Sequence, residues 1–201
     1  MDKKAFYKLT YGLFLLSAQE EGRDNACIIN TAIQVANDPA RVAFAVLKGN
    51  HTHDMILRSG VFAISSISES AEFELFRRFG MQSGREVDKF EGFADAARGK
   101  NGLYYLTKGA NMTMSGRVVE KMDLGSHTLF VAEVDDAVVL NDEPSCTYAY
   151  YQSDIKPQAK KEEKKGWVCT VCGYVYEGDP LPADFICPWC KHGAEDFVRQ
   201  K

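Results

Sequence analysis

Residues 24–56 read DNACIINTAIQVANDPARVAFAVLKGNHTHDMI. The runs CIINTAIQV (27–35) and VAFAVL (42–47) are rich in β-branched or alternating apolar residues, and the turn-forming Asn-Asp-Pro of residues 37–39 separates them. The run THDMILRSG (52–60) has a helical pattern that ends in glycine. This stretch therefore predicts two strands followed by a helix.

Further strand and helix patterns follow along the chain. Strands are predicted at VFAISSI (61–67), MTMSGRVVEKM (112–122) and HTLFVAEVDDAVVL (127–140), and a second helix at SAEFELFRRFG (70–80). Five or more strands with few helices predict a mainly β domain, barrel-like, with flanking helices. The G-x-G-x-x-G and P-loop patterns are both absent from the sequence, so neither a Rossmann nor a nucleoside-triphosphate signature is present.

The composition bounds the class of protein. With 201 residues, 45% of them hydrophobic and 26% charged, the chain has the composition of a globular protein. Its formal net charge of −4 argues against a nucleic-acid-binding protein, which usually carries a basic footprint. No apolar run approaches the roughly 20 residues that span a bilayer, and the start MDKKAFYKLTYGLF lacks a small-residue cleavage site. We therefore expect a cytoplasmic protein with neither a nucleic acid nor a membrane as partner.

A charged segment divides the chain. Residues 156–165, KPQAKKEEKK, contain five lysines, two glutamates and no large apolar residue. Such a segment cannot bury enough surface to offset its ordering entropy, so it predicts a flexible linker. The expected organisation is a domain over residues 1–155, a linker over 156–165 and a small domain over 166–201. The formal charges of the three parts are −5, +3 and −2.

Four of the six cysteines form two C-x-x-C pairs in the small domain, Cys169 with Cys172 and Cys187 with Cys190. This spacing predicts a tetrahedral metal site with four thiolate ligands. Sulfur ligation alone leaves two metals possible. Zinc would be a redox-inactive structural ion, whereas iron would cycle between the ferric and ferrous states. The remaining cysteines, Cys27 and Cys146, are far apart in sequence, which indicates a reducing compartment rather than a disulfide scaffold.

The residues around the cysteines favour iron. Glycine follows Cys172 and proline follows Cys187, and the aromatic residues nearby can wrap so small a site. The pattern W-V-C-x-x-C-G-Y-V-Y-E-G-D-P…C-P-x-C resembles rubredoxin, a one-iron electron carrier. The short interval between the two C-x-x-C pairs resembles that of the truncated rubredoxin module of rubrerythrins. This resemblance implies a redox iron, and a structural zinc ribbon is the alternative.

The larger domain resembles the FMN-binding flavin reductase-like family, which has a split β-barrel fold. The resemblance lies in the stretch 24–56, in FGMQSGREVDKF (79–90) and in DLGSHTLFVAEV (123–134). It implies that FMN is bound by side chains at strand ends and turns, with Thr52 at a helix start that suits a phosphate. It also implies that Lys89 neutralises the phosphate or the reduced ring, and that His127 lies near the flavin. The matching positions are Asn25, Asn30, Thr31, Asn50, His51, Thr52, Ser83, Gly84, Lys89 and His127.

Plainer readings exist for several of these residues. His51 and His53 can be turn residues, and His127 can be a structural histidine at a strand start. Lys89 can be a solvated surface lysine. The asparagines at 25 and 30 can serve only to satisfy turn and strand-end hydrogen bonds.

A flavin reductase-like domain followed by a rubredoxin module resembles the high-molecular-weight rubredoxins. This resemblance implies an NAD(P)H-dependent oxidoreductase and electron-transfer protein of an anaerobe, with FMN and one four-cysteine iron as cofactors. The electrons would pass from NADH or NADPH through FMN and iron to a flavodiiron protein that detoxifies oxygen or nitric oxide. It also implies a homodimer. Two alternatives remain: a flavin or ferric reductase with a structural zinc-ribbon tail, and a non-catalytic flavin-binding interaction module.

Overall fold

The structure is a computed structural model that describes residues 2–157 and 166–200. It divides into two compact units, Met1–Ile155 and Lys156–Lys201, which are considered separately below. Most of the segment expected to be a linker, residues 158–165, lies outside the described residues. Among the helices of the described parts, none is long and apolar enough to cross a membrane.

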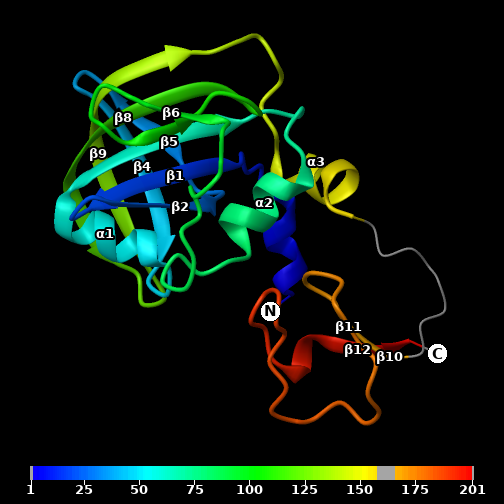
Figure 1. Ribbon diagram of the computed structural model, residues 1–201. Helices are drawn as coiled ribbons and strands as arrows, with labels where there is room; N and C mark the ends of the chain where they lie inside the picture. Colours follow the sequence, from blue (N-terminus) through cyan, green and yellow to red (C-terminus); the bar gives the residue numbers. More distant parts are fainter. Residues whose placement is uncertain (1, 158–165, 201) are drawn as a thin grey trace. The chain divides into compact units, whose positions relative to one another are not determined.

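The larger unit is built on one seven-stranded sheet, in which all neighbouring strands are antiparallel (Figure 1). Its strand order is β2-β1-β5-β8-β9-β4-β3. The strands are β1 (Phe14–Glu20), β2 (Arg23–Ile29), β3 (Ile33–Asn37), β4 (Ala40–Leu47), β5 (Val61–Ile67), β8 (Ala110–Asp123) and β9 (His127–Val139).

A short link forces this sheet to curl. β2 and β3 lie at opposite edges of the sheet, yet only residues 30–32 separate them in sequence. Six strand spacings would hold the edges of a flat sheet about 29 Å apart. The link from Ile29 to Ile33 spans at most about 14 Å. The two edges must therefore approach each other, which gives the sheet a barrel-like form with an opening between β2 and β3.

The prediction of one continuous strand over residues 27–35 is wrong for this reason. The run breaks at Asn30, and its two halves become the opposite edges of the sheet. Thr31 lies in the link and joins it to β4, because its hydroxyl donates to the Ala45 carbonyl at 2.9 Å and accepts from the Ala45 N–H at 3.2 Å. Ala45 lies beyond the last β4 residue that pairs with β3, so this hydroxyl occupies backbone groups that β3 leaves unpaired.

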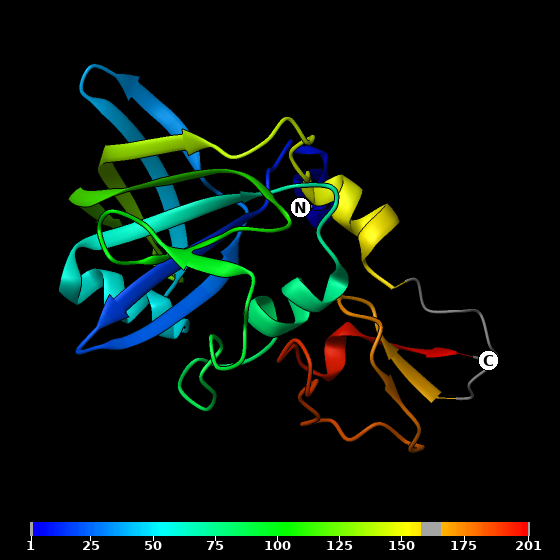
Figure 2. The same ribbon diagram turned by 45° about the horizontal axis from the view of Figure 1, so that its top comes forward.

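The curled sheet has a hydrophobic core on each face, and each core takes in one helix. The helices α1 (His51–Ser59) and α2 (Phe73–Gly80) lie on different sides of the sheet (Figures 1 and 2). The first core joins α1 to residues of strands at both ends of the sheet and contains the fully buried Phe44, Phe62 and Phe130. The second core joins α2 to alternate residues of β1 and β2. The expected mainly β fold with flanking helices is thus confirmed.

Smaller elements complete the larger unit. The hairpin of β6 (Ala96–Arg98) and β7 (Tyr104–Leu106) packs on β1 and β5 and was not expected from the sequence. Three short helical segments lie near the ends of the unit: η1 (Lys3–Lys8), α3 (Tyr148–Tyr150) and η2 (Tyr151–Ile155).

The smaller unit is a three-stranded sheet with strand order β11-β10-β12. Its elements are β10 (Gly166–Cys169), β11 (Val175–Tyr176), η3 (Ala194–Asp196) and β12 (Phe197–Gln200). Its core consists of the buried Cys169, Cys187 and Phe197, surrounded by partly buried aromatic residues and the other two cysteines. Since two cysteines occupy the centre of this core, the fold of the unit depends on what the sulfurs bind.

The link between the sheet edges generates the first prediction. Thr31→Val keeps the shape of the side chain but leaves the Ala45 N–H and carbonyl without their partner. We expect the free energy of unfolding to fall by about 1–3 kcal/mol, the cost of leaving partly buried backbone groups unsatisfied. Chemical denaturation of the flavin-free protein, monitored by far-ultraviolet circular dichroism, measures this change in the free energy of unfolding. Thr107→Val, at an exposed threonine, should stay within about 0.5 kcal/mol of the parent; equal effects of the two changes would contradict the proposed role of Thr31.

Candidate flavin and metal sites

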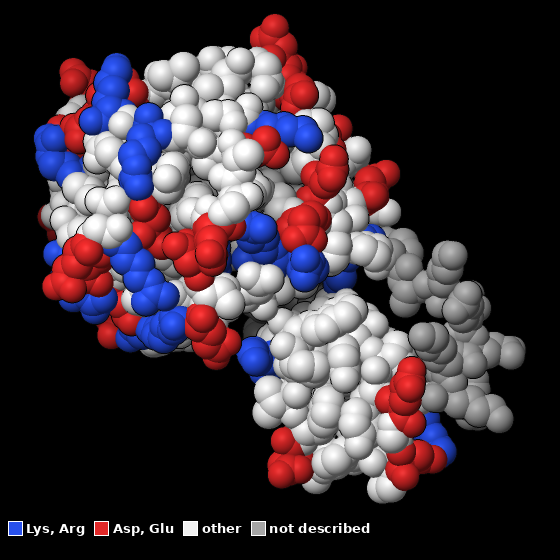
Figure 3. Space-filling view, viewed as in Figure 1, with Lys and Arg blue, Asp and Glu red and all other residues white. Residues whose placement is uncertain are grey.

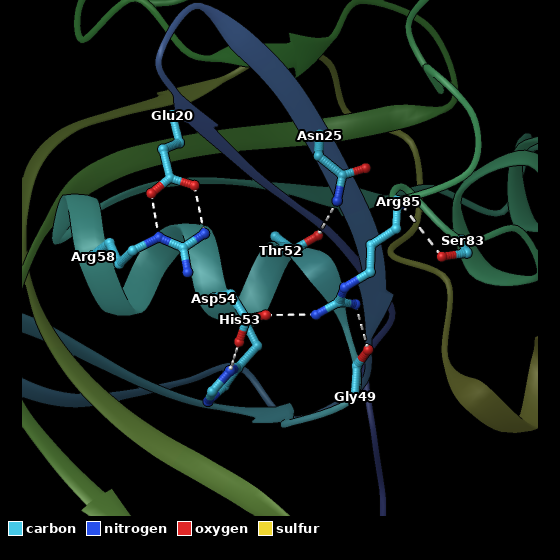
Figure 4. Close-up of polar contacts among 9 residues, drawn as sticks. All are labelled: Glu20, Asn25, Gly49, Thr52, His53, Asp54, Arg58, Ser83 and Arg85. Carbon is cyan, nitrogen blue, oxygen red and sulfur yellow. Dashed lines mark hydrogen bonds and ion pairs between the residues drawn. The ribbon is translucent and has the colours of Figure 1, made fainter.

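The first turn of α1 lies against β2. The helix begins at His51, directly after β4 and a turn, and Asn50 at its N-cap has an extended backbone but makes no capping bond with its side chain. The Asn25 amide of β2 donates to the Thr52 hydroxyl at 2.9 Å, and both residues are almost fully buried (Figure 4). This bond fixes the helix N-terminus, whose first N–H groups have no partner within the helix and favour an anion.

Two buried polar atoms at this place have no partner among the described residues. They are Oδ1 of Asn25 and Nε2 of His51. The pKa of His51 is lowered, first by burial and then by the nearby Arg85 and Arg23, so the imidazole is neutral at pH 7. Because buried polar groups in folded proteins are normally hydrogen-bonded, two such atoms beside a helix N-terminus fit a bound ligand.

Arginines surround the same helix N-terminus, and sequence reasoning missed them. Arg85 donates to the Gly49 carbonyl at 2.9 Å and forms an ion pair with Asp54 of α1 (Figure 4). The backbone N–H of Arg85 donates to the Ser83 hydroxyl, and this bond stabilises the turn of residues 83–85. Arg23 donates to the Gly84 carbonyl at 2.7 Å. In the sequence, the indication that Arg85 belongs to the site was its position directly after Ser83 and Gly84.

Asp54 joins these groups to the core of the sheet. Its carboxylate contacts the His53 ring, whose other nitrogen lies 2.9 Å from the Thr128 hydroxyl of β9. The hydrogen bond with His53 and the charge of Arg85 hold the pKa of Asp54 below its usual range. His53 is therefore a buried positioning residue between α1 and β9, rather than a simple turn residue.

Gly84 is packed against Asn25. A Cβ atom built on Gly84 would lie 2.2 Å from Asn25 Oδ1 and 2.5 Å from its Cγ, far inside van der Waals contact. Glycine is therefore required here, because any larger residue would displace the amide that holds Thr52.

The Lys89 ammonium is buried below the same turn. It donates to the carbonyls of Ala26 and Phe79, both at 2.9 Å, and burial lowers its pKa. Lys89 is thus buried rather than a solvated surface residue. The hydrogen bonds of its ammonium group hold β2, α2 and the 83–89 segment together. Its direct contact with a phosphate or a flavin ring stays a prediction. The neighbouring Cys27 thiol contacts Thr52 and Asn50, and burial raises its pKa.

The remaining candidate residues lie on the link between β2 and β3 and at the start of β9. Asn30 and Thr31 form the link after β2, and His127 begins β9 opposite Leu47 of β4. His127 is half-buried, and its Nδ1 lies 2.9 Å from the Ser126 hydroxyl. The structure thus gathers Asn25, Asn50, His51, Thr52, Ser83 and Gly84 around the start of α1, and places Asn30, Thr31 and His127 on the link and on β9.

A flavin phosphate fits the first turn of α1. The helix N-terminus and two arginines supply positive potential, and the unpartnered Nε2 of His51 adds a hydrogen-bonding group. Elsewhere the viewed face of the larger unit carries basic and acidic side chains interspersed (Figure 3).

The four cysteines of the smaller unit converge on one point. Their sulfurs all lie within 4.8 Å of one another, with 3.5 Å between those of Cys169 and Cys190 and 3.4 Å between those of Cys172 and Cys187. A tetrahedral ion with metal–sulfur bonds of about 2.3 Å requires sulfurs about 3.8 Å apart. The cage therefore fits a single metal ion with four thiolate ligands.

Backbone N–H groups point at these sulfurs. Tyr174 donates to Cys172, His192 to Cys190, and Trp189 and Cys190 to Cys187. In the absence of metal, burial raises the pKa of Cys190 to about 11, and burial also raises the pKa of Cys172. Hydrogen bonds to thiolates stabilise added negative charge, so they would favour ferric-to-ferrous reduction of a bound iron.

Comparisons with known proteins match both parts of the chain. The model of the flavin reductase like domain matches residues 6–158, and the model of the rubredoxin-like domain of rubrerythrin matches residues 167–198. High molecular weight rubredoxin of Moorella thermoacetica is 33% identical, over 98% of this chain and 99% of that protein. The ferric-chelate reductase (NAD(P)H) of Archaeoglobus fulgidus is 38% identical, over 75% of this chain and 89% of that protein.

A solved structure of similar fold is the FMN-binding protein of Thermus thermophilus with bound 1-cyclohex-2-enone. It has a TM-score of 0.60 and 25% sequence identity, over 67% of this chain and 74% of that one. The chain therefore belongs to the flavin reductase like family. Along almost its whole length it is a homologue of high molecular weight rubredoxin, with a flavin-binding fold followed by a rubredoxin-like iron site of four cysteines.

The packing of Gly84 on Asn25 generates a prediction for flavin binding. Gly84→Ala should displace the Asn25 amide and weaken flavin binding by at least about tenfold, the loss of roughly one buried hydrogen bond. Fluorescence titration of the flavin-free protein with FMN measures the affinity. Gly99→Ala is the matched control, since its Cβ would meet nothing closer than 3.7 Å. Unchanged affinity in Gly84→Ala would remove this turn from the flavin site.

The cage generates a prediction for the metal. Cys172→Ser removes one of four ligands, so we expect the purified protein to lose the visible thiolate-to-iron absorption and most of its iron. Both tryptophans, Trp167 and Trp189, lie in the smaller unit, so their fluorescence reports its folding. Cys146→Ser, in the larger unit, should keep full iron content. Zinc in the parent protein, or iron retained at parent levels in Cys172→Ser, would contradict the iron assignment.

Proposed function

We propose that this protein is an NAD(P)H-dependent oxidoreductase that delivers electrons from FMN in the larger unit to an iron ion in the four-cysteine cage. A flavodiiron protein that reduces oxygen or nitric oxide is the proposed acceptor. The observation that carries the proposal is the presence in one chain of a flavin reductase fold and a four-sulfur cage. Flavin-based electron transfer follows from these two domains, and the donor, the flavin and the acceptor are the proposed part.

The two groups have complementary chemistry. A bound flavin would supply the ability to take a hydride from NADH or NADPH and release electrons singly. Iron with four thiolate ligands would supply a one-electron couple. No side-chain acid or nucleophile is required for this reaction, which agrees with the buried, structural character of His53, Lys89 and Cys27.

The residues of the chain would bind and orient the flavin. The first N–H groups of α1, the Thr52 hydroxyl and Arg85 would hold the phosphate, while Asn25 positions Thr52. The similarity of fold to the FMN-binding protein of Thermus thermophilus supports FMN as the flavin. The neutral His51 would offer its unpartnered Nε2 to the ligand. Thr31 and His127, on the link and on β9, would flank the ring.

Other features support the setting of this reaction. The six cysteines form no disulfide among the described residues, which supports a reducing compartment such as the cytoplasm. Exposed apolar side chains on β3 and at the end of β8, including Ile33 and Met122, support burial in a homodimer. Light scattering would then report twice the mass of one chain, and a mass of one chain would contradict the dimer.

Ferric-chelate reduction is a second candidate function. The observation that favours it is the 38% identity to a ferric-chelate reductase, which matches 75% of this chain. The two functions differ in whether the four-cysteine cage is required. Reduction of a ferric chelate by the Cys172→Ser variant at the parent rate would favour this second function.

The proposal predicts the response of the protein to NADH or NADPH. Under anaerobic conditions, one of these donors should bleach both the flavin absorbance and the ferric thiolate absorbance. In Cys172→Ser the flavin band alone should bleach. A stopped-flow absorbance measurement with each donor in turn checks this, and dithionite serves as the control that shows full reduction. Failure of both donors to bleach a protein that dithionite bleaches would contradict the oxidoreductase assignment and favour a non-catalytic flavin-binding module.

A further inference from the structure

A cavity lies in the larger unit, between the β6–β7 hairpin and the sheet. Its walls come from β5, β8 and β9 on one side and from residues 98–105 on the other, and its volume is about 230 Å³. None of the residues assigned above to flavin binding lines it. The proposed electron transfer makes no use of this cavity.

The size of the cavity selects a class of ligand. An engineered protein cavity of about 150 Å³ holds benzene, whereas sites for drug-sized ligands occupy about 300–1,000 Å³. A cavity of 230 Å³ thus holds one ring with a small substituent and is too small for a flavin or a dinucleotide.

The charges at the cavity are already paired. Lys100 lies at 2.6 Å from the Asp136 carboxylate, and Arg98 forms two hydrogen bonds with Asp24 at 2.7 and 3.0 Å. A charged ligand would therefore find no charged side chain free to pair with it, and it would lose its hydration on binding. The cavity suits a neutral molecule.

Two hydroxyl groups of the lining remain free. The hydroxyls of Ser115 and Tyr105 have no hydrogen-bond partner among the described residues, although Ser115 is only 8% exposed. The apolar part of the lining includes Ala63, Leu103 and Val138. A ring could lie on these side chains while its substituent meets the two hydroxyls.

A β-bulge, with Asp135 of β9 as its extra residue, lies beside Ser115 of the cavity lining. The register of β8 and β9 shifts between Ser115 and Gly116, so Ser115 pairs with Asp136 and Gly116 with Val134. A Cβ on Gly116 would lie 1.9 Å from the Glu133 carbonyl oxygen, so only glycine permits this close approach. Bulges re-aim side chains and are frequent beside functional sites.

We propose that this cavity is a binding site for a neutral one-ring aromatic compound with a hydroxyl or carbonyl substituent. The ring contacts the apolar lining, and the substituent forms hydrogen bonds with the hydroxyls of Ser115 and Tyr105. The site thus gives the larger unit a small-molecule ligand in addition to the flavin.

Phenol and benzoate are the probes that test this site. Both have one ring, but phenol is neutral at pH 7 and benzoate is an anion. Titration of the full-length protein, followed by the methyl resonances of Ala63, Leu103 and Val138, should show saturable shifts with phenol. We expect a dissociation constant of about 0.1–10 mM for so small a ligand and at least about tenfold weaker binding of benzoate.

Two conservative variants locate the hydrogen bonds. Tyr105→Phe and Ser115→Ala each remove one hydroxyl and should weaken phenol binding about three- to tenfold. Tyr11→Phe makes the same chemical change away from the cavity and should leave the affinity unchanged. No saturable shift with phenol, shifts at other methyl groups only, benzoate binding as tight as phenol, or equal affinity in all three variants would overturn the proposal.

Discussion

The three-residue link between β2 and β3 is the constraint on which the larger unit depends. Because it joins the two edges of a seven-stranded sheet, the sheet cannot be flat, and strands from both of its ends share one core with α1. The same link carries Thr31, whose hydroxyl satisfies backbone groups of β4 that β3 leaves free. The curl therefore produces both the core and the opening beside which the candidate flavin residues lie.

Within this frame, the start of α1 is held from several directions. Asn25 bonds Thr52 from β2, Arg85 bonds Asp54 and the Gly49 carbonyl from the 83–85 turn, and His53 reaches Thr128 on β9. None of these bonds uses the N–H groups of His51 and Thr52, whereas the His53 N–H donates to the Asn50 carbonyl. A rigid helix N-terminus with free donors costs little to reorganise when an anion binds, which is the usual basis of phosphate sites at helix starts.

The sequence was informative where chemistry is local and less so where distant residues meet. The C-x-x-C spacing predicted the metal cage, and strand patterns with two helices predicted the mainly β fold, with both helices found within a few residues of their expected bounds. The break at Asn30 was missed, because the strand prediction included this asparagine, although asparagine is depleted in strands. Arg85, Arg23 and the packing of Gly84 on Asn25 were also missed, since they depend on contacts between residues about 30 to 60 positions apart in sequence.

The central claim is that electrons held by the flavin leave through the iron of the four-cysteine cage. This requires the iron couple to lie at a more positive potential than the flavin couple, and the N–H groups directed at three of the four sulfurs favour such a potential. Anaerobic spectroelectrochemical titration of the intact protein measures both couples in one experiment. The account predicts that, as the potential is lowered, the ferric absorbance bleaches before the flavin absorbance. An iron couple well below that of the flavin, or a cage that holds zinc and shows no couple, would contradict it.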